Sequence, residues 1–354
     1  MGASHPSPSE RYGVAPSGIP EWYRPKGTKT AFDFPKAKEG KPDRYEFNVG
    51  ARPVGKPRRL DRVLIERFVG FSRSFFQKMI KDGKVLIDGK PTKASWHVMP
   101  HEVVTVILPP ATKHLAEDIP LEVIYRDEWM LGLSKPSGII IHPARGNKTG
   151  TLYNGLLNYF KEERAADPSF HIGTVHRLDE ETSGVIVFAL DKKAHGELTR
   201  QFEFRKLQKT YLCIAHGVPE FTEKIIDAPL GVDPTDRHRA AVNGLDARPA
   251  KTTYKVLAVS PCGKFSFMRA YPHTGRSHQI RIHAKALGHP LVGDELYEGK
   301  KYDPAFGELV PRVCLHAESL ALKHPGQGHP MMLTAPLPAD MVAMAEQLGL
   351  KPNL

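Results

Sequence analysis

HRLDEETSGVIVFAL, residues 176–190, places an acidic turn directly before an apolar run. The run VIVFAL, which follows Gly184 and precedes Asp191, predicts a buried strand. Asp179 stands in the turn with Glu180 and Glu181 beside it. An Asp in a turn before a strand is most often a local cap or a solvated ion pair. These residues alone therefore leave open whether Asp179 serves the turn or a reaction.

Strand and helix signals alternate around this segment from residue 121 to the end of the chain. Their connections mix hairpins with helical crossovers, and no Gly-rich phosphate loop opens a helix after a strand. We therefore expect an α+β domain over residues 121–354, built on a mixed, mainly antiparallel sheet. Strands are predicted in KTYLCIAHG, KTTYKVLAV and FSFMRAYP, and helices in TLYNGLLNYF, DKKAHGELTRQFEF and HQIRIHAKALG.

A smaller α/β unit is predicted over residues 58–110, followed by a linker at 111–120. Two short helices, in LDRVLIERF and FSRSFFQKMIKDG, precede strands in VLIDGKP and EVVTVIL. Basic side chains are spread over the polar side of the helices: Arg62, Arg73, Lys78, Lys81 and Lys84. Residues 1–57 contain nine Pro and seven Gly with little hydrophobic periodicity, so we expect a basic, mostly disordered arm.

The composition narrows the class of protein. The chain has 354 residues and a net charge of +11, which favours polyanionic partners such as nucleic acid. No apolar run reaches the length of a membrane span, and the N-terminal residues lack the apolar core of a secretion signal. Three widely spaced cysteines fit neither a disulfide framework nor a zinc site. We expect a cytoplasmic protein, monomeric by default.

Several further motifs carry a specific resemblance. In order along the chain, SKPSGIIIHPA (134–144), KTYLC (209–213), TGRSHQIRIHAKALGHPLVGDELY (274–297) and LHAESLALKHP (315–325) accompany HRLDEETSG. Together they resemble the RluA-type family of RNA pseudouridine synthases over roughly residues 121–337. The unit at 58–110 resembles the RNA-binding module first recognised in a small-subunit ribosomal protein. Ser134 departs from the family's usual Asn, and Pro100-His101-Glu102 replaces the module's common Gly-Asp.

The resemblance implies an isomerase that converts uridine in structured RNA to pseudouridine. That reaction breaks the N1–C1′ bond and rejoins the base through C5, so it needs no metal or redox cofactor. By resemblance Asp179 is the catalytic carboxylate, Arg281 is the cation paired with it, and Tyr211 stacks on the uracil. A carboxylate suits direct attack on a carbon or proton transfer at the ribose, and the sequence leaves the covalent route open.

The remaining site predictions concern RNA. Contacts with the substrate are expected from Arg177, Arg276, His278 and Lys135 in the larger domain, and from Arg62, Arg73 and Lys78 in the smaller unit. The His residues match no metal-ligand spacing, so no metal is expected. The motifs favour large-subunit ribosomal RNA, with transfer RNA as an alternative. Two other functions stay open, a non-catalytic ribosome-assembly protein and a hydrolytic glycosidase with a second carboxylate at Glu180 or Glu181.

Overall fold

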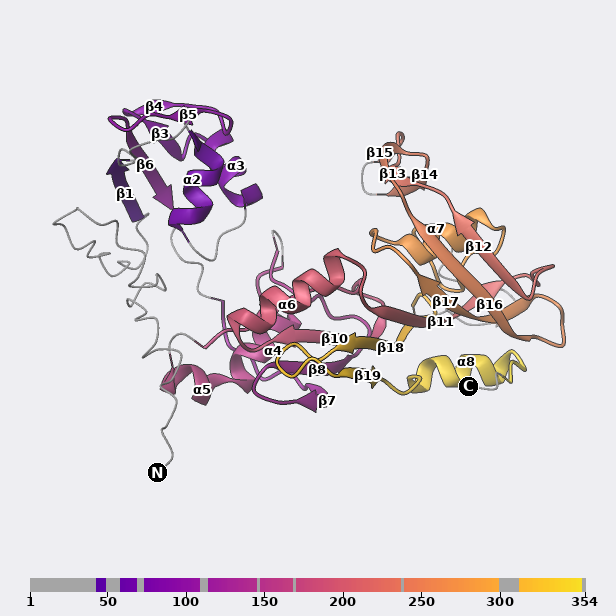
Figure 1. Ribbon diagram of the computed structural model, residues 1–354. Helices are drawn as coiled ribbons and strands as arrows, with labels where there is room; N and C mark the ends of the chain where they lie inside the picture. The colour runs from indigo at the N-terminus through magenta and orange to yellow at the C-terminus, as the bar shows by residue number, and fades with distance from the viewer. Residues whose placement is uncertain are drawn as a thin grey trace. The chain divides into compact units, whose positions relative to one another are not determined.

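The chain divides into two compact units, residues 1–113 and residues 114–354 (Figure 1). The computed structural model describes residues 43–48, 58–68, 73–108, 114–144, 147–167, 170–236, 239–298 and 312–351. Within these ranges, no helix is both long and apolar enough to cross a membrane.

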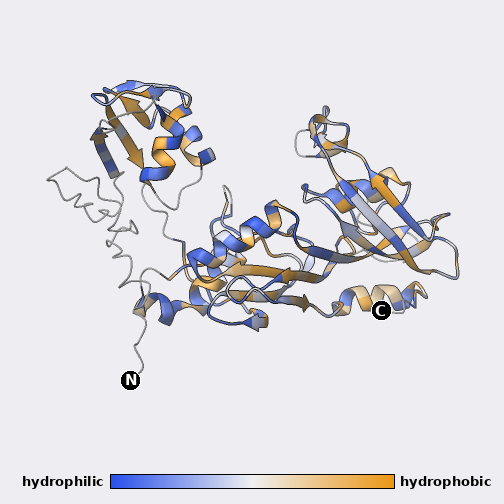
Figure 2. Cartoon of the chain, in the orientation of Figure 1, coloured by the Kyte–Doolittle hydropathy of each residue, from blue (hydrophilic) through white to orange (hydrophobic). Residues whose placement is uncertain are grey.

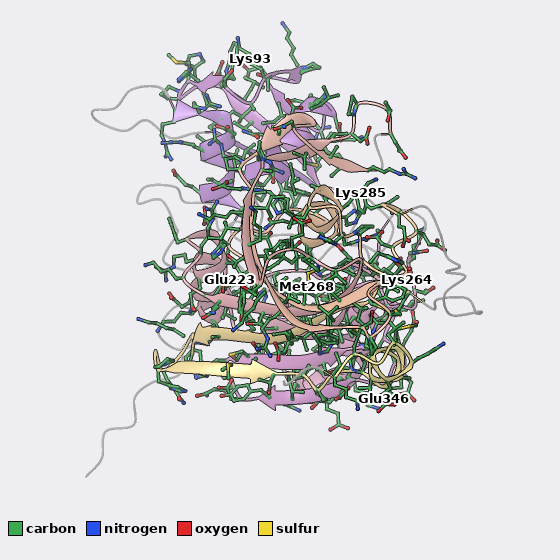
Figure 3. The ribbon with its side chains drawn as sticks, turned by 90° about the vertical axis from the view of Figure 1, so that its right-hand side faces the viewer. Lys93, Glu223, Lys264, Met268, Lys285 and Glu346 are labelled. Atoms are coloured by element: carbon green, nitrogen blue, oxygen red, sulfur yellow. The ribbon has the colours of Figure 1, made fainter. Side chains whose placement is uncertain are left out.

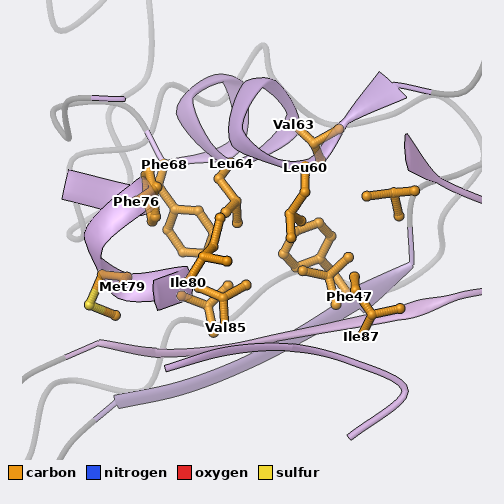
Figure 4. Packing of buried hydrophobic residues seen from close by; sticks show 13 residues of the cluster. Phe47, Leu60, Val63, Leu64, Phe68, Phe76, Met79, Ile80, Val85 and Ile87 are labelled. Atoms are coloured by element: carbon orange, nitrogen blue, oxygen red, sulfur yellow. The ribbon is translucent and has the colours of Figure 1, made fainter. Parts of the chain in front are cut away.

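The first unit confirms the predicted pair of helices and the hairpin. Helices α2 (Leu60–Arg67) and α3 (Arg73–Lys81) pack on a sheet of order β1-β6-β3-β4. Its strands are β1 (Asp43–Asn48), β3 (Val85–Ile87), β4 (Lys90–Pro91) and β6 (Val103–Leu108), with β2 (Arg58–Arg59) and β5 (His97–Val98) paired beside it. Leu60, Leu64, Phe76 and Val85 are fully buried between helices and sheet (Figure 4).

One boundary of this unit was predicted wrongly. The sequence predicts a mostly disordered arm over residues 1–57, but β1 pairs along its whole length with β6. Phe47 of β1 is buried in the core, where Phe68 packs against it with ring centroids 6.1 Å apart. The unit therefore begins before residue 58, and the rest of the predicted arm lies outside the described residues.

The second unit is built on a ten-stranded sheet, as the α+β prediction required. Its main strand order is β12-β16-β17-β11-β18-β10-β8-β7, with β19 added to β18 and β9 added to β10. All described pairings are antiparallel except the short one between β10 and β18. The strands are β7 (Glu122–Arg126), β8 (Met130–Lys135), β9 (Gly173–Thr174), β10 (Ser183–Ala189), β11 (Gln208–His216), β12 (Glu223–Asp227), β16 (Lys251–Val259), β17 (Phe265–Pro272), β18 (Leu315–Lys323) and β19 (Pro330–Thr334).

Helices cover both faces of this sheet. Side chains alternate along β10, so Val185 and Val187 pack beneath α6 (Lys192–Glu203), while Ile186 and Phe188 face α4 (Leu152–Tyr159). Helix α7 (Gln279–Ala286) and helix α8 (Ala339–Gln347) cover opposite faces of β11 and β17. Figure 2 shows the hydrophobic central strands and the mixed polarity of α6. The smaller elements are α5 (Lys161–Ala166), β13 (Leu230–Val232), β14 (Ala240–Val242) and β15 (Leu245–Arg248).

The predicted linker also needs a correction. The second unit starts at residue 114, so residues 114–120 belong to it rather than to a linker at 111–120. The side-chain amide of Asn154 on α4 donates a hydrogen bond to the carbonyl of Leu115 at 2.7 Å. The backbone N–H of Glu117 donates to the carbonyl of Asn154 at 3.1 Å. Residues 111–113 lie outside the described part of the chain.

Candidate active site

The turn that carries Asp179 enters the sheet where β10 and β18 run side by side. The backbone N–H of Thr182 donates to the carbonyl of Asp179 at 3.1 Å and closes the turn. Gly184 follows with φ +114°, and a Cβ at this position would lie 2.2 Å from the carbonyl oxygen of Ala317 on β18. Only glycine fits such a close parallel approach, so Gly184 fixes the direction in which the turn leaves the sheet.

Lys135 supports the turn from inside the protein. Its side chain is 1% exposed, and its ammonium donates to the carbonyls of Pro136, Ile139 and Glu180, each at 2.9 Å. Burial, with the nearby charge of Arg312, lowers the pKa of Lys135 to about 8. An ammonium enclosed by three carbonyls cannot reach a phosphate. The prediction that Lys135 contacts RNA is therefore wrong, and the residue holds the turn instead.

Arg312 holds the other side of the same turn. Its guanidinium donates to the carbonyl of Glu181 at 3.2 Å and to the hydroxyl of Ser183 at 3.2 Å. The Asp340 carboxylate at the start of α8 accepts two hydrogen bonds from it, at 2.6 and 3.0 Å. The segment that follows Asp179 is thus bound by Lys135 and by Arg312, and Asp340 on α8 holds Arg312 in turn.

Arg281 is a buried cation that faces the Asp179 carboxylate. Its Nη1 lies 3.8 Å from Oδ2 of Asp179, and its side chain is 5% exposed. The other side of the guanidinium binds Asp294, with Nε–Oδ2 at 2.8 Å and Nη2–Oδ1 at 2.6 Å. Burial acts to lower the pKa of Arg281, but Asp294 and Asp179 outweigh it and the pKa is raised. The guanidinium is therefore charged and oriented by Asp294 toward Asp179.

His278 approaches Asp179 from the start of α7. It adopts a left-handed conformation with φ +55°, and its Nε2 lies 3.9 Å from Oδ1 of Asp179. Its Nδ1 lies 2.8 Å from the hydroxyl of Tyr297. Burial lowers the pKa of His278, and Arg281 acts in the same direction against the opposite effect of Asp179. The ring is therefore neutral near pH 7, with both nitrogens directed by neighbours.

A small hollow of about 80 Å³ opens beside Asp179. Tyr211 of β11 lines it, and burial together with the negative Asp179 raises the pKa of the Tyr211 phenol, which stays protonated. Exposed Arg177 and half-buried Arg276 stand in the same lining. Arg276 also donates to the carbonyl of Pro249 at 3.2 Å, so its side chain is held in place.

The structure thus gathers Asp179, Arg281, Tyr211, His278, Arg177 and Arg276 around one hollow. Reasoning from sequence missed Asp294 and Tyr297, which orient Arg281 and His278. Both belong to the quoted segment 274–297, in the run GDELY, but an Asp in a loop gives no sign of its partner. Arg62 and Lys78 are exposed on the first unit, whereas Arg73 is bound to the buried Asp61, with Nη2–Oδ2 at 2.8 Å.

The chemistry available in the hollow follows from these groups. A partly exposed carboxylate beside a buried guanidinium can act as a nucleophile or move a proton. A neighbouring aromatic ring can stack on a flat base. Among the described residues, no three His, Cys, Asp or Glu side chains gather as metal ligands do. Tyr211 in the hollow, with Arg177 and Arg276 in the same lining, suits a planar, negatively charged group such as a nucleotide.

Known proteins identify the class further. A family model described as RNA pseudouridylate synthase matches residues 130–286, and one described as S4 domain matches residues 58–104. A protein of Chlorobaculum parvum named as an uncharacterized RNA pseudouridine synthase is 37% identical over 313 residues, 83% of this chain and 95% of the relative. The ribosomal large subunit pseudouridine synthase D of Neisseria meningitidis serogroup B is 35% identical over 84% of this chain and 80% of its own.

The fold is also that of solved synthases. The structure of human RNA pseudouridylate synthase domain containing 4 matches with a TM-score of 0.54 at 24% identity, over 66% of this chain and 95% of the human one. This chain belongs to the RluA-type family of RNA pseudouridine synthases. It is an enzyme that isomerises uridine in RNA to pseudouridine, and its first unit contains an S4 domain.

Proposed function

We propose that Asp179 is the catalytic carboxylate and that the substrate is large-subunit ribosomal RNA. The observation that carries the first part is the position of Asp179, whose carboxylate is 24% exposed at the 80 Å³ hollow with Arg281 3.8 Å away. The relatives named ribosomal large subunit pseudouridine synthase D, together with the S4 domain, support the second part.

Each group of the site has a role in this proposal. The target uridine leaves the RNA stack, since a base inside a folded RNA cannot otherwise reach a pocket. Its uracil stacks on Tyr211, while Arg177 and Arg276 bind flanking phosphates or fill the gap that the uridine leaves. Asp179 then attacks a carbon or moves a proton at the ribose, and either route starts cleavage of the N1–C1′ bond. Arg281 pairs with the carboxylate and holds it in place.

The test replaces Asp179 with Asn, which keeps the size and removes the charge. Tritium release from C5-labelled uridine in ribosomal RNA transcripts should vanish, while the melting temperature and RNA affinity stay near those of the wild type. Glu180→Gln is the matched control and should leave turnover close to normal, because Glu180 contributes its backbone carbonyl to the turn. A folded Asp179→Asn protein that still releases tritium near the wild-type rate would return Asp179 to a turn-stabilising role.

A separate experiment tests which RNA is the substrate. Pseudouridines mapped across total RNA from a strain lacking this protein should be missing from large-subunit ribosomal RNA. Their loss from transfer RNA instead would favour the tRNA-directed alternative, and no loss anywhere would favour an assembly protein without catalysis. We further propose that the enzyme works in the cytoplasm as a monomer without a cofactor, which gel filtration and a chelator-treated preparation would check.

A further inference from the structure

A second and larger hollow adjoins the catalytic one. Its volume is about 480 Å³, against about 80 Å³ for the hollow at Asp179. Volumes of ~300–1,000 Å³ are typical of sites that enclose a small organic ligand. Lys209 and Pro272 line both hollows, so the two share a wall. A molecule that fills the catalytic hollow and extends beyond it meets the second hollow directly.

The second hollow lies over one face of three adjacent strands. Thr253 and Lys255 of β16 are two residues apart and therefore project to the same face. Tyr271 of β17 stands opposite Thr253, and Glu223 of β12 stands opposite Lys255. All four line the hollow, and Glu223 is labelled in Figure 3. The register of the sheet thus places an aromatic ring and a cation side by side on a fixed surface.

Positive charge continues from this hollow to the catalytic one. The basic residues Arg205, Lys209 and Lys255 are in the lining, and Glu223 is the acidic residue there. Burial lowers the pKa of Lys209 to about 8, and the charge of Arg205 adds to the effect.

Arg276, in the lining of the catalytic hollow, interacts with Arg205 of the second hollow. Burial lowers its pKa, with Arg248 and then Arg205 acting in the same direction. Cations near enough to repel one another across the shared wall create a site for a polyanion rather than for a single neutral ligand.

Tyr271 provides a flat surface in the second hollow. Its side chain is half-buried, and Arg269, two residues before it on the same face of β17, interacts with it electrostatically. Arg269 in turn donates two hydrogen bonds to the Glu318 carboxylate, at 3.0 and 2.8 Å. The ring is therefore held before any ligand arrives. A fixed aromatic ring beside cations is the arrangement by which proteins bind unpaired bases and their phosphates.

We propose that the second hollow binds the nucleotide next to the target uridine in single-stranded form. Its base stacks on Tyr271, and its phosphate lies between Arg205, Lys209 and Lys255. This rests on the proposed function, because a uridine in the catalytic hollow is joined to its neighbours through phosphodiesters. In this proposal one neighbour leaves across the shared wall at Lys209. The enzyme therefore requires an unpaired nucleotide beside the target as well as the target itself.

The test compares binding of uridine 5′-monophosphate with that of oligouridylates of two to five nucleotides, using the full chain and calorimetry. The variant is Lys255→Gln combined with Tyr271→Leu. The matched control is Lys264→Gln combined with Tyr159→Leu, which removes one exposed cation and one exposed tyrosine elsewhere on the same unit. In Figure 3, Lys264 lies well away from Glu223. Lys255→Gln alone repeats the test without altering a partly buried ring.

In the wild type and the control, the trinucleotide should bind about tenfold more tightly than the mononucleotide, the size expected for one stacked base. In the variant this gain should fall below about threefold, with unchanged affinity for the mononucleotide. A variant that keeps the gain, or a wild type that lacks it, would overturn the proposal.

Turnover separates this inference from the proposed function. On ribosomal RNA the variant should raise KM about tenfold and change kcat by less than about twofold. Absence of tritium release from any RNA by the wild type would refute the proposed catalysis while leaving the length-dependent binding as a separate result. A fall in kcat without a rise in KM would show that the second hollow acts in the chemical step, contrary to the proposal.

Discussion

Asp294→Asn tests whether Arg281 depends on its second carboxylate. Asp294 is fully buried, binds Arg281 through two hydrogen bonds at 2.8 and 2.6 Å, and accepts a third from the backbone N–H of Tyr297 at 3.1 Å. It does not line the hollow beside Asp179. The change therefore removes the support of the cation without touching the groups we expect to contact the substrate.

The cost in stability follows from burial. Removing one partner of a buried ion pair destabilises proteins by ~3–5 kcal/mol. Asparagine keeps the size and one acceptor of Asp294, and Asp179 still lies 3.8 Å from Arg281, so the lower end, about 3 kcal/mol, is expected. For a domain of ~150–250 residues each kcal/mol shifts Tm by ~2–4 °C, which gives a fall of about 6–12 °C.

Asp294→Asn should lower kcat by more than its loss of stability alone would explain. Without Asp294, Arg281 can swing toward Asp179, and a displacement of ~1 Å in an active site costs on the order of 100-fold in rate. We expect kcat in the tritium-release assay to fall by about 100-fold at a temperature where melting curves show a folded protein. KM should change little, because Asp294 makes no contact with the hollow.

Asp127→Asn is the control for this experiment. Asp127 accepts hydrogen bonds from the backbone N–H groups of Trp129 and Met130, both at 2.8 Å, and pairs with His324 at 2.5 Å. These contacts lie at the start of β8, whereas Lys135 is the last residue of that strand. Asp127→Asn should lower Tm and leave kcat unchanged. If Asp294→Asn also melts earlier but keeps the wild-type kcat, Arg281 needs no second carboxylate and our account of its orientation fails.

Three further predictions concern RNA contacts, the pH dependence of stability and the removal of metal ions. Replacing exposed Arg62 and Lys78 together by Gln should flatten the slope of log RNA affinity against log salt by about 1.5, at ~0.7–0.9 per phosphate contact; an unchanged slope would mean that neither contacts phosphate. Lys209 has a folded-state pKa of about 8, below the 10.5 of its unfolded form. Between these values the unfolded chain binds more protons, so the stability of the wild type relative to Lys209→Met in urea should rise from pH 8 to 10.5. Lys135, whose pKa is also about 8, contributes equally to both proteins. Exhaustive dialysis against a chelator should leave turnover intact, and activity regained only with added metal would contradict a metal-free reaction.

The sequence predicted the elements of the second unit because their signals are local. VIVFAL is uniformly apolar, and β10 is buried on both faces between α4 and α6. Strand β1 gave no comparable signal, because DRYEFN has only Tyr45 and Phe47 as apolar residues and follows a Pro- and Gly-rich stretch. What makes it a strand is its pairing with β6, whose residues lie some sixty positions later. A pairing between segments so far apart in the sequence cannot be recognised from the residues of the short strand alone.

The errors at the site have a different physical origin. Lysine is almost never fully buried, so a Lys in a loop motif predicts a surface cation, yet three carbonyls enclose Lys135. Asp294 was missed for the converse reason, since a loop carboxylate is usually solvated. In both cases the partner lies on another segment: Glu180 is 45 positions from Lys135, and Arg281 is 13 positions from Asp294. The reactive residues could be recognised from their motifs, whereas the residues that orient them acquire their role only through the fold. Substitutions at Lys135 and Asp294 should therefore impair turnover through the geometry around Asp179, which separates them experimentally from Asp179 itself.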